Sequence, residues 1–198
     1  MIPGAAMSAA DATATPRRPG REAELLQLPS WCGNAAASLA VCLGWAATTW
    51  IALHLRADVT LHTAALFVHL ASLVLGFGAV LAIDYYGALW LTGRKTLREV
   101  LDFTAPLHIP VWIGLGGLLF SGAFLHPDLS SPMTCVKLGL VLVLSLNGVQ
   151  ASALHRRLVA VDGGPVPRPL LIRGAVTASV SQVAWWGAVA IGFLNSQH

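Results

Sequence analysis

The chain has few charged residues. Lysine, arginine, aspartate and glutamate make up 11% of the 198 residues, against about 25% in typical soluble domains. Apolar residues make up 56%, and the mean hydropathy is +0.69. This composition excludes an ordinary soluble protein. The length leaves room for one helical bundle with short connections and none for an added soluble domain.

Cysteine and methionine are also rare, with three of each. Cys32, Cys42 and Cys135 show no CxxC spacing, which argues against a disulfide framework and against a zinc or redox motif. The chain has no phosphate-binding loop, dinucleotide glycine pattern, GxSxG nucleophile or HExxH motif. It carries no nucleic-acid-binding motif, although its net charge is +3. The soluble enzyme classes that those motifs mark are excluded, and no nucleic-acid partner is expected.

What the chain does have is long apolar stretches. A helix that crosses a bilayer needs about 20 predominantly apolar residues. Five stretches meet that need without an acidic side chain, lysine or arginine: Gly33–Leu53, Thr63–Ile83, Leu107–Leu125, Leu138–Leu154 and Gly174–Leu194. The sequence therefore predicts an all-α integral membrane bundle of five transmembrane helices in residues 31–198, preceded by a mobile tail, residues 1–30.

The connections between the stretches are short, which predicts that consecutive helices are antiparallel neighbours: Arg56–Leu61, Thr92–Pro106, His126–Cys135 and Arg157–Pro169. Tryptophans near the predicted span ends are typical of interfacial anchors: Trp31, Trp50, Trp90, Trp112, Trp185 and Trp186.

Basic residues are distributed unevenly about these five spans. Two fall on one side, Arg56 and Lys137, and ten on the other: Arg17, Arg18, Arg21, Arg94, Lys95, Arg98, Arg156, Arg157, Arg168 and Arg173. Because cytoplasmic loops are enriched in lysine and arginine, this asymmetry predicts a cytoplasmic N-terminus and an external C-terminus. The expected location is the cell inner (plasma) membrane, crossed several times.

His69 is the main candidate for a functional residue, because an ionisable group inside a bilayer is costly. It lies about two helical turns inside the second stretch, and His62 and Gly76 share its helix face at a spacing of seven residues. A histidine with glycine on one stripe leaves room for a flat ligand such as haem. The alternative is that the glycine permits close helix packing and that His69 forms a hydrogen bond to a neighbouring helix.

The other histidines lie near the predicted membrane surfaces. His54, His62 and His126 are expected near the external surface, where they join His69 as a candidate copper or other metal site, since imidazole suits Cu, Zn and Fe. Solvated interfacial histidines are the alternative. His108 and His155, both at the cytoplasmic ends of adjacent antiparallel helices, form a candidate second pair.

A few other polar residues lie in or near the spans. Asp84 is expected to pair with Arg94, Arg98 or Arg173. The amides of Asn147, Gln150 and Gln182 are expected to bond across helices. Lys137, at the external end of the fourth stretch, can extend to the interface or neutralise an anionic group such as a propionate.

An ordered set of short motifs resembles a known group of membrane proteins: Phe67-Val68-His69-Leu70, Gly76-Phe77-Gly78, Arg94, Arg98, Gly116-Gly117-Leu118 and Lys137-Leu138. Over about residues 60–158 this set resembles the haem-binding protoporphyrinogen oxidase family and the copper-resistance D membrane domain. The resemblance implies that His69 binds haem and that Lys137 matches the lysine that opens a later helix. That family usually carries another histidine about three turns after the lysine, where this chain has Asn147-Gly148.

Three functions follow as hypotheses. The first is a b-type haem-binding membrane protein in redox chemistry or haem metabolism, with His69 as axial ligand, His62 or a group on a neighbouring helix opposite, and Lys137 balancing the ligand's charge. Whether it is an enzyme is left open.

The second hypothesis is a protein that handles copper, another metal or a solute through His54, His62, His69 and His126, although few methionines are present for soft copper. The third is a non-catalytic structural or assembly subunit. Its glycine-rich helices, such as the Gly114–Gly117 stretch, would pack against other membrane subunits or a second copy.

Overall fold

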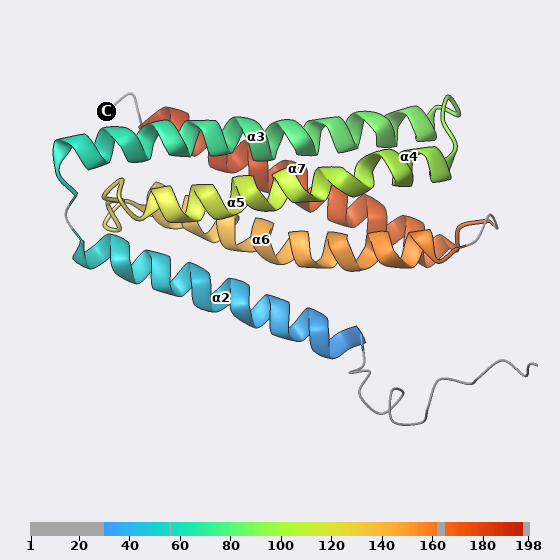
Figure 1. Ribbon diagram of the computed structural model, residues 1–198, viewed down its shortest axis with the longest axis horizontal. Coiled ribbons are helices and arrows are strands. Elements are labelled where there is room, and N and C mark those ends of the chain that lie inside the picture. The colour runs from blue at the N-terminus through green and yellow to red at the C-terminus, as the bar shows by residue number, and fades with distance from the viewer. Residues whose placement is uncertain (1–29, 56, 162–164, 196–198) are drawn as a thin grey trace, which may run out of the picture. The chain divides into compact units, whose positions relative to one another are not determined.

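A computed structural model describes residues 30–55, 57–161 and 165–195, and within these residues it is helical with no strand. Five helical segments are long and apolar enough to cross a membrane, the third of them running from Leu97 to Gly122, which confirms the predicted all-α architecture with five candidate spans. In order along the chain (Figure 1), the elements are α2 Ser30–His54, α3 Val59–Leu91, α4 Leu97–Thr104, the 3-10 turn η1 Ala105–Leu107, α5 His108–Gly122, α6 Pro132–Val159 and α7 Arg168–Asn195.

Contacts divide the chain into two units, Met1–Gly33 and Asn34–His198. The predicted tail lies outside the described residues, apart from Ser30, and so does Arg56. In the second unit, α3 packs along α5 and α6 packs along α7. The direction in which the helices cross the membrane stays a prediction.

Helix α3 is much longer than the predicted span. Its 33 residues measure about 50 Å at 1.5 Å per residue, whereas the hydrocarbon layer is about 30 Å thick. Asp58 begins the helix, and its carboxylate accepts a hydrogen bond from the Leu61 N–H at 2.7 Å. The apolar run alone underestimates the helix, because Asp84, Tyr85 and Tyr86 continue it beyond the hydrophobic segment.

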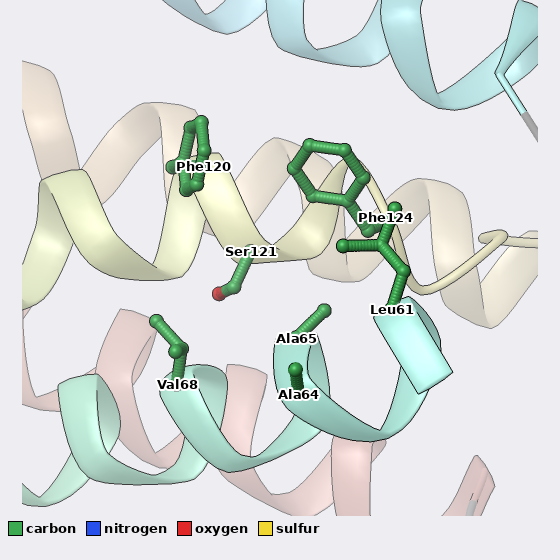
Figure 2. Close-up of a pocket in the computed structure, with 7 residues that line it drawn as sticks. All are labelled: Leu61, Ala64, Ala65, Val68, Phe120, Ser121 and Phe124. Atoms are coloured by element: carbon green, nitrogen blue, oxygen red, sulfur yellow. The ribbon is translucent and has the colours of Figure 1, made fainter. Parts of the chain in front are cut away.

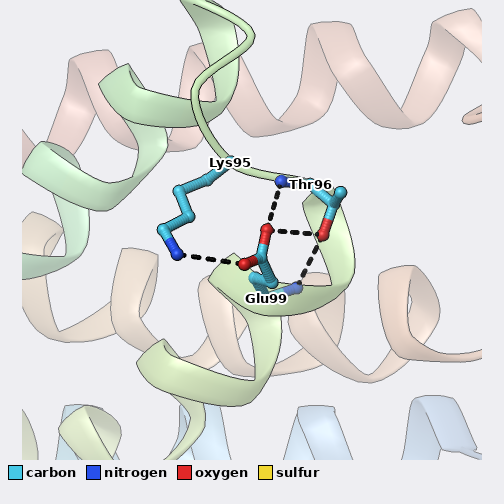
Figure 3. A network of polar contacts seen from close by, with 3 residues as sticks. All are labelled: Lys95, Thr96 and Glu99. Atoms are coloured by element: carbon cyan, nitrogen blue, oxygen red, sulfur yellow. Dashed lines mark hydrogen bonds and ion pairs between the residues drawn. The ribbon is translucent and has the colours of Figure 1, made fainter.

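The predicted connection Thr92–Pro106 is wrong in its second half, because residues 97–104 form α4. Thr96 and Glu99 form a reciprocal capping box: the Thr96 hydroxyl accepts from the Glu99 N–H, and the Glu99 carboxylate accepts from the Thr96 N–H at 2.8 Å (Figure 3). Lys95 adds an ion pair to Glu99 at 3.0 Å. This cap starts a short amphipathic helix that a search for long apolar runs overlooks.

Glycine allows α3 and α5 to approach very closely. A Cβ added to Gly114 would lie 2.5 Å from the Gly76 Cα and 2.8 Å from the Ser72 carbonyl oxygen. A Cβ on Gly117 would collide with the Ser72 hydroxyl. Small residues therefore face each other across this interface, as in many membrane helix pairs. The glycine stripe that includes Gly76 supports helix packing in the described structure.

The core is centred on Trp185 of α7, which is 2% exposed. It packs with Val80, Leu115, Leu118, Leu144 and Ala184, so the core joins α3, α5, α6 and α7. The Trp185 ring stacks on Phe77, with centroids 5.3 Å apart, and its edge fills the space beside Gly76. The prediction that Trp185 is an interfacial anchor is wrong, because position 185 lies in the middle of α7 and faces the other helices.

Helix α2 has a different environment from the other four. None of the residues in its apolar window is buried. Two hydrogen bonds attach it to α6: the Trp45 indole N–H donates to the Leu138 carbonyl at 3.0 Å, and the Arg156 guanidinium donates to the Asn34 amide oxygen at 2.9 Å. Large apolar side chains such as Leu43 and Trp50 are exposed at 61%. Such a surface is suited to contact with the lipid bilayer.

The α3–α5 contact gives a direct test of the fold. Gly114→Ala is expected to lower stability by about 1–3 kcal/mol, because the added methyl group meets backbone atoms that cannot move aside. Gly116→Ala is the matched control: a Cβ there meets nothing within 4 Å, so the change is expected to be neutral or stabilising by up to about 1 kcal/mol. The measurement is thermal stability in detergent by size-exclusion chromatography. Equal stability of both variants would contradict the close approach.

Candidate functional site

His69 of α3 is hydrogen-bonded to Ser121 of α5. The distance from its Nδ1 to the Ser121 hydroxyl oxygen is 2.9 Å. The Ser121 hydroxyl in turn donates to the Gly117 carbonyl oxygen at 2.5 Å. A serine hydroxyl has only one proton. The short bond to Gly117 favours the arrangement in which Ser121 donates that proton to Gly117 and accepts from His69, with the imidazole proton on Nδ1.

This arrangement determines which ring nitrogen is left for a ligand. A neutral imidazole with its proton on Nδ1 has a lone pair on Nε2, the atom that binds a metal or accepts a proton. Ligating histidines usually have their other ring nitrogen held by a hydrogen bond, which sets both tautomer and orientation. Ser121 is 1% exposed, so this bond is shielded from solvent. His69 is thus a half-buried histidine whose ring is held by Ser121 through Nδ1, so that Nε2 is the nitrogen suited to bind a metal ion or to accept a proton.

A shallow groove of about 150 Å³ lies beside Ser121, between α3 and α5 (Figure 2). It is lined by Leu61, Ala64, Ala65, Val68, Phe120, Ser121 and Phe124, and the Ser121 hydroxyl is the single polar side-chain group among them. Pockets for small molecules usually measure about 300–1,000 Å³. Since Phe120 is 67% exposed, a large flat ligand would lie against the outer face of the helix pair rather than in a closed cavity.

The space beside Gly76 is occupied. The Gly114 backbone and the Trp185 ring both lie within 3.5 Å of where a Gly76 Cβ would be. Gly122, by contrast, lies next to His69, since a Cβ there would be 3.8 Å from the His69 Cε1. Gly76, a predicted ligand-binding residue, therefore supports helix packing. The glycine that the structure places beside His69 is Gly122, which was not predicted.

Lys137 is half-buried near the start of α6. Its ammonium nitrogen lies against α7, 3.8 Å from the position of a Cβ on Gly192. It is also the charged side chain that acts electrostatically on His69. One cation therefore lies near the candidate ligand, which suits a ligand that carries negative charge.

The predicted external histidines are only partly brought together. The His62 and His126 rings stack nearly parallel, with centroids 5.8 Å apart. The His126 Nε2 accepts a hydrogen bond from the Ala57 N–H at 2.8 Å, and its backbone has a φ of 47°, in the left-handed region. His54 instead forms a hydrogen bond with the Trp50 carbonyl oxygen one turn earlier in its own helix, and its ring stacks on the Trp50 indole.

No group of three or more histidine, cysteine or acidic residues is placed to hold a metal within residues 30–55, 57–161 and 165–195. In the loop after α5, hydrogen bonds from the Ser130 hydroxyl and N–H hold the pKa of Asp128 below its usual value. That carboxylate is two residues after His126 but lies in no such group.

The second histidine pair is close. The His108 and His155 rings lie 5.0 Å apart in an edge-to-face arrangement, at the ends of α5 and α6. Both are half-buried. The structure thus pairs the histidines at each end of the bundle, one pair at His62–His126 and one at His108–His155.

Three other polar candidates bond across helices, whereas no hydrogen bond from Gln150 to the described residues supports the same expectation for its amide. Asn147 donates to the Thr177 carbonyl oxygen at 2.9 Å, which confirms its expected role between α6 and α7. Gln182 donates to the Asp84 carboxylate, so the partner of Asp84 is an amide on α7 rather than the expected arginine. Every buried side-chain nitrogen and oxygen among the described residues has a hydrogen-bond partner.

Ser121 is the site residue that the sequence reasoning missed. A serine four residues after a glycine in an apolar helix normally bonds the carbonyl of its own preceding turn, and Ser121 does so with Gly117. Its second role requires α3 to be placed against α5. The alternative that His69 forms a hydrogen bond to a neighbouring helix is confirmed, but no sequence feature specified Ser121 as the partner.

The His69–Ser121 bond predicts a stability difference between two serines. Ser121→Ala is expected to cost about 1 kcal/mol, because a cross-helix hydrogen bond is lost and Nδ1 is left without its partner. Ser145→Ala is the matched control, since Ser145 is equally buried and bonds only the Val141 carbonyl of its own helix. Thermal unfolding in detergent measures both. A Ser145→Ala variant as unstable as Ser121→Ala would contradict a specific cross-helix contribution.

Comparisons with protein-family models, with curated proteins and with solved structures gave no match. The resemblance to the haem-binding oxidase family and to the copper-resistance D domain stays a prediction from the motifs in residues 60–158.

Proposed function

We propose that this multi-pass membrane protein binds a b-type haem through His69 and serves redox chemistry or haem metabolism. The observation that carries the proposal is the hydrogen-bond chain from His69 through Ser121 to Gly117. With the Ser121 proton donated to the Gly117 carbonyl, His69 has its proton on Nδ1 and its lone pair on Nε2, which is the form of histidine that binds haem iron.

The surroundings of His69 support a flat apolar ligand with an anionic edge. Aromatic and aliphatic side chains line the neighbouring groove, among them Phe120, Phe124 and Val68. Lys137 supplies a positive charge near the ring, which suits a propionate. Bound haem would provide a centre for electron transfer or oxygen chemistry, with its properties set by the axial ligand and the surrounding polarity.

If the haem iron has a second protein ligand, we expect it on a neighbouring helix rather than at His62. His62 and His69 are seven residues apart on one helix, which is about 10 Å along its axis. Two imidazole nitrogens that share one metal ion lie about 4 Å apart. The His62 ring also faces His126 rather than His69. His69 therefore acts as the defining ligand in this proposal.

The arginine-rich end of the bundle is, in this proposal, the cytoplasmic side of the inner membrane. The α3–α4 connection carries Arg94 and Lys95, the end of α6 carries Arg156 and Arg157, and Arg168 begins α7. The positive-inside tendency assigns such an end to the cytoplasm. His69, Lys137 and the His62–His126 pair then lie toward the external half.

A reduced-minus-oxidised absorption spectrum tests the haem proposal. The purified protein, expressed with adequate haem supply, is expected to show a Soret band and a sharp α-band. His69→Ala is expected to lose most of the bound haem, because the axial ligand is removed. His54→Ala is the matched control: that exposed histidine bonds only within its own helix, so the spectrum should be retained.

Two results would overturn the haem proposal. One is a flat spectrum of the wild-type protein under those conditions. The other is a His69→Ala protein that folds and keeps its full haem content.

A second candidate function is the binding of copper or another metal ion at the external end, and the stacked pair His62–His126 favours it. Imidazoles suit copper and zinc. A metal ion would have to replace the Ala57 N–H at the His126 Nε2 or bind the other ring nitrogen. The pair would need further ligands from water or solute, since no third donor of the described residues joins it.

Metal titration of the haem-free protein tests this second candidate. Zn²⁺ binding measured by calorimetry is expected to weaken in His62→Ala and in His126→Ala, because each removes one of two donors. His54→Ala should bind like the wild type. Binding that is unchanged in both pair variants would refute a metal site at this position.

A further inference from the structure

A small polar groove lies at the arginine-rich end of the bundle, far along α6 from Lys137. It measures about 50 Å³ and is formed by three helices: Asn34 of α2, the residues Gln150, Ala153, Leu154 and Arg157 of α6, and Arg173 and Thr177 of α7. On α6 these residues recur at spacings of three and four, so they share one helix face. Two guanidinium groups and two amides thus meet beside a short apolar wall.

The charge of this groove is not compensated within the protein as far as it is described. Among residues 30–55, 57–161 and 165–195 no acidic side chain forms an ion pair with Arg157 or Arg173. The neighbouring Arg156 is engaged with the Asn34 amide oxygen at 2.9 Å, which holds the start of α2 beside the end of α6. The Asn147 bond to the Thr177 carbonyl fixes α7 against α6 one turn away. These contacts therefore hold the three helices around the groove, and Arg157 and Arg173 remain available to bind an anion.

The position of the groove indicates the kind of anion. It lies at the ends of apolar helices, where a bilayer changes from hydrocarbon to headgroups. Ala153 and Leu154 supply its apolar lining, between Gln150 and Arg157 along α6. A guanidinium fork matches the geometry of phosphate oxygens. Basic pockets between transmembrane helices are a recurring way of binding anionic headgroups.

We propose that the groove formed by Asn34, Gln150, Arg157, Arg173 and Thr177 binds the phosphate of an anionic membrane lipid. The volume suits a phosphate group with its chain lying outside, along Leu154. Bound in this way, the lipid would bridge α2, α6 and α7. Arg157 and Arg173 then have a recognition role beyond the topological role that they share with the other basic residues.

Native mass spectrometry of the full-length protein in detergent tests the proposal, with phosphatidylglycerol and phosphatidylcholine as probes. The wild type is expected to retain one phosphatidylglycerol in preference to phosphatidylcholine. Arg157→Gln with Arg173→Gln is expected to weaken that binding by roughly 10- to 30-fold, from about 1 kcal/mol for each arginine near the headgroups. Arg94→Gln with Arg168→Gln removes the same charge from exposed positions outside the groove and should leave the first lipid in place.

A third variant keeps the test decisive if the glutamine variant fails to fold. Arg157→Lys with Arg173→Lys preserves the charge but loses the bidentate fork, so its affinity for phosphatidylglycerol should fall below that of the wild type. An unchanged affinity in this variant would overturn the proposal. Equal losses in the groove and control variants would do the same, because they would indicate general charge attraction. So would displacement of the lipid by excess inorganic phosphate, because the site would then take a free anion.

Discussion

The close approach of α3 and α5 is the contact on which the candidate site depends. Gly76 and Gly114 bring the two backbones so near that no side chain fits between them. The same interface, continued by two turns toward the start of α3, brings Ser121 to His69. Without this approach the serine would bond only its own helix, and no cross-helix bond would orient the histidine ring. The same α3–α5 interface thus provides both the close packing of small residues and the hydrogen bond that orients His69.

Polar groups inside the bundle satisfy one another across the helices. Asp84 with Gln182, Asn147 with the Thr177 carbonyl, and His69 with Ser121 each link a different helix pair. In hydrocarbon an unpaired polar group is costly, and such pairs hold helices in register. His69 differs from the other pairs in one respect, because its bond uses one ring nitrogen and leaves a second for chemistry. That difference separates a candidate ligand from a purely structural residue.

The sequence was sufficient for the architecture because the bilayer imposes a simple rule. Five apolar runs of adequate length must form helices, and five are found. The predictions that were wrong concern features that are determined by tertiary contacts or by local helix caps. Trp185 lies in the core because α7 turns position 185 inward, and α4 forms because Thr96 and Glu99 cap it. Asp84 bonds Gln182 because α3 extends beyond its apolar segment and reaches the middle of α7.

The site was predictable in part. His69, Lys137 and the pairing of His108 with His155 follow from their positions in the spans, whereas Ser121 and Gly122 depend on how α5 is rotated against α3. The most direct test of the central claim is the ¹⁵N spectrum of the His69 ring in labelled protein, before and after haemin is added. We expect a protonated Nδ1 and an unprotonated Nε2, with the Nε2 signal lost when iron binds. A protonated Nε2, or a ring spectrum that haemin leaves unchanged, would contradict it.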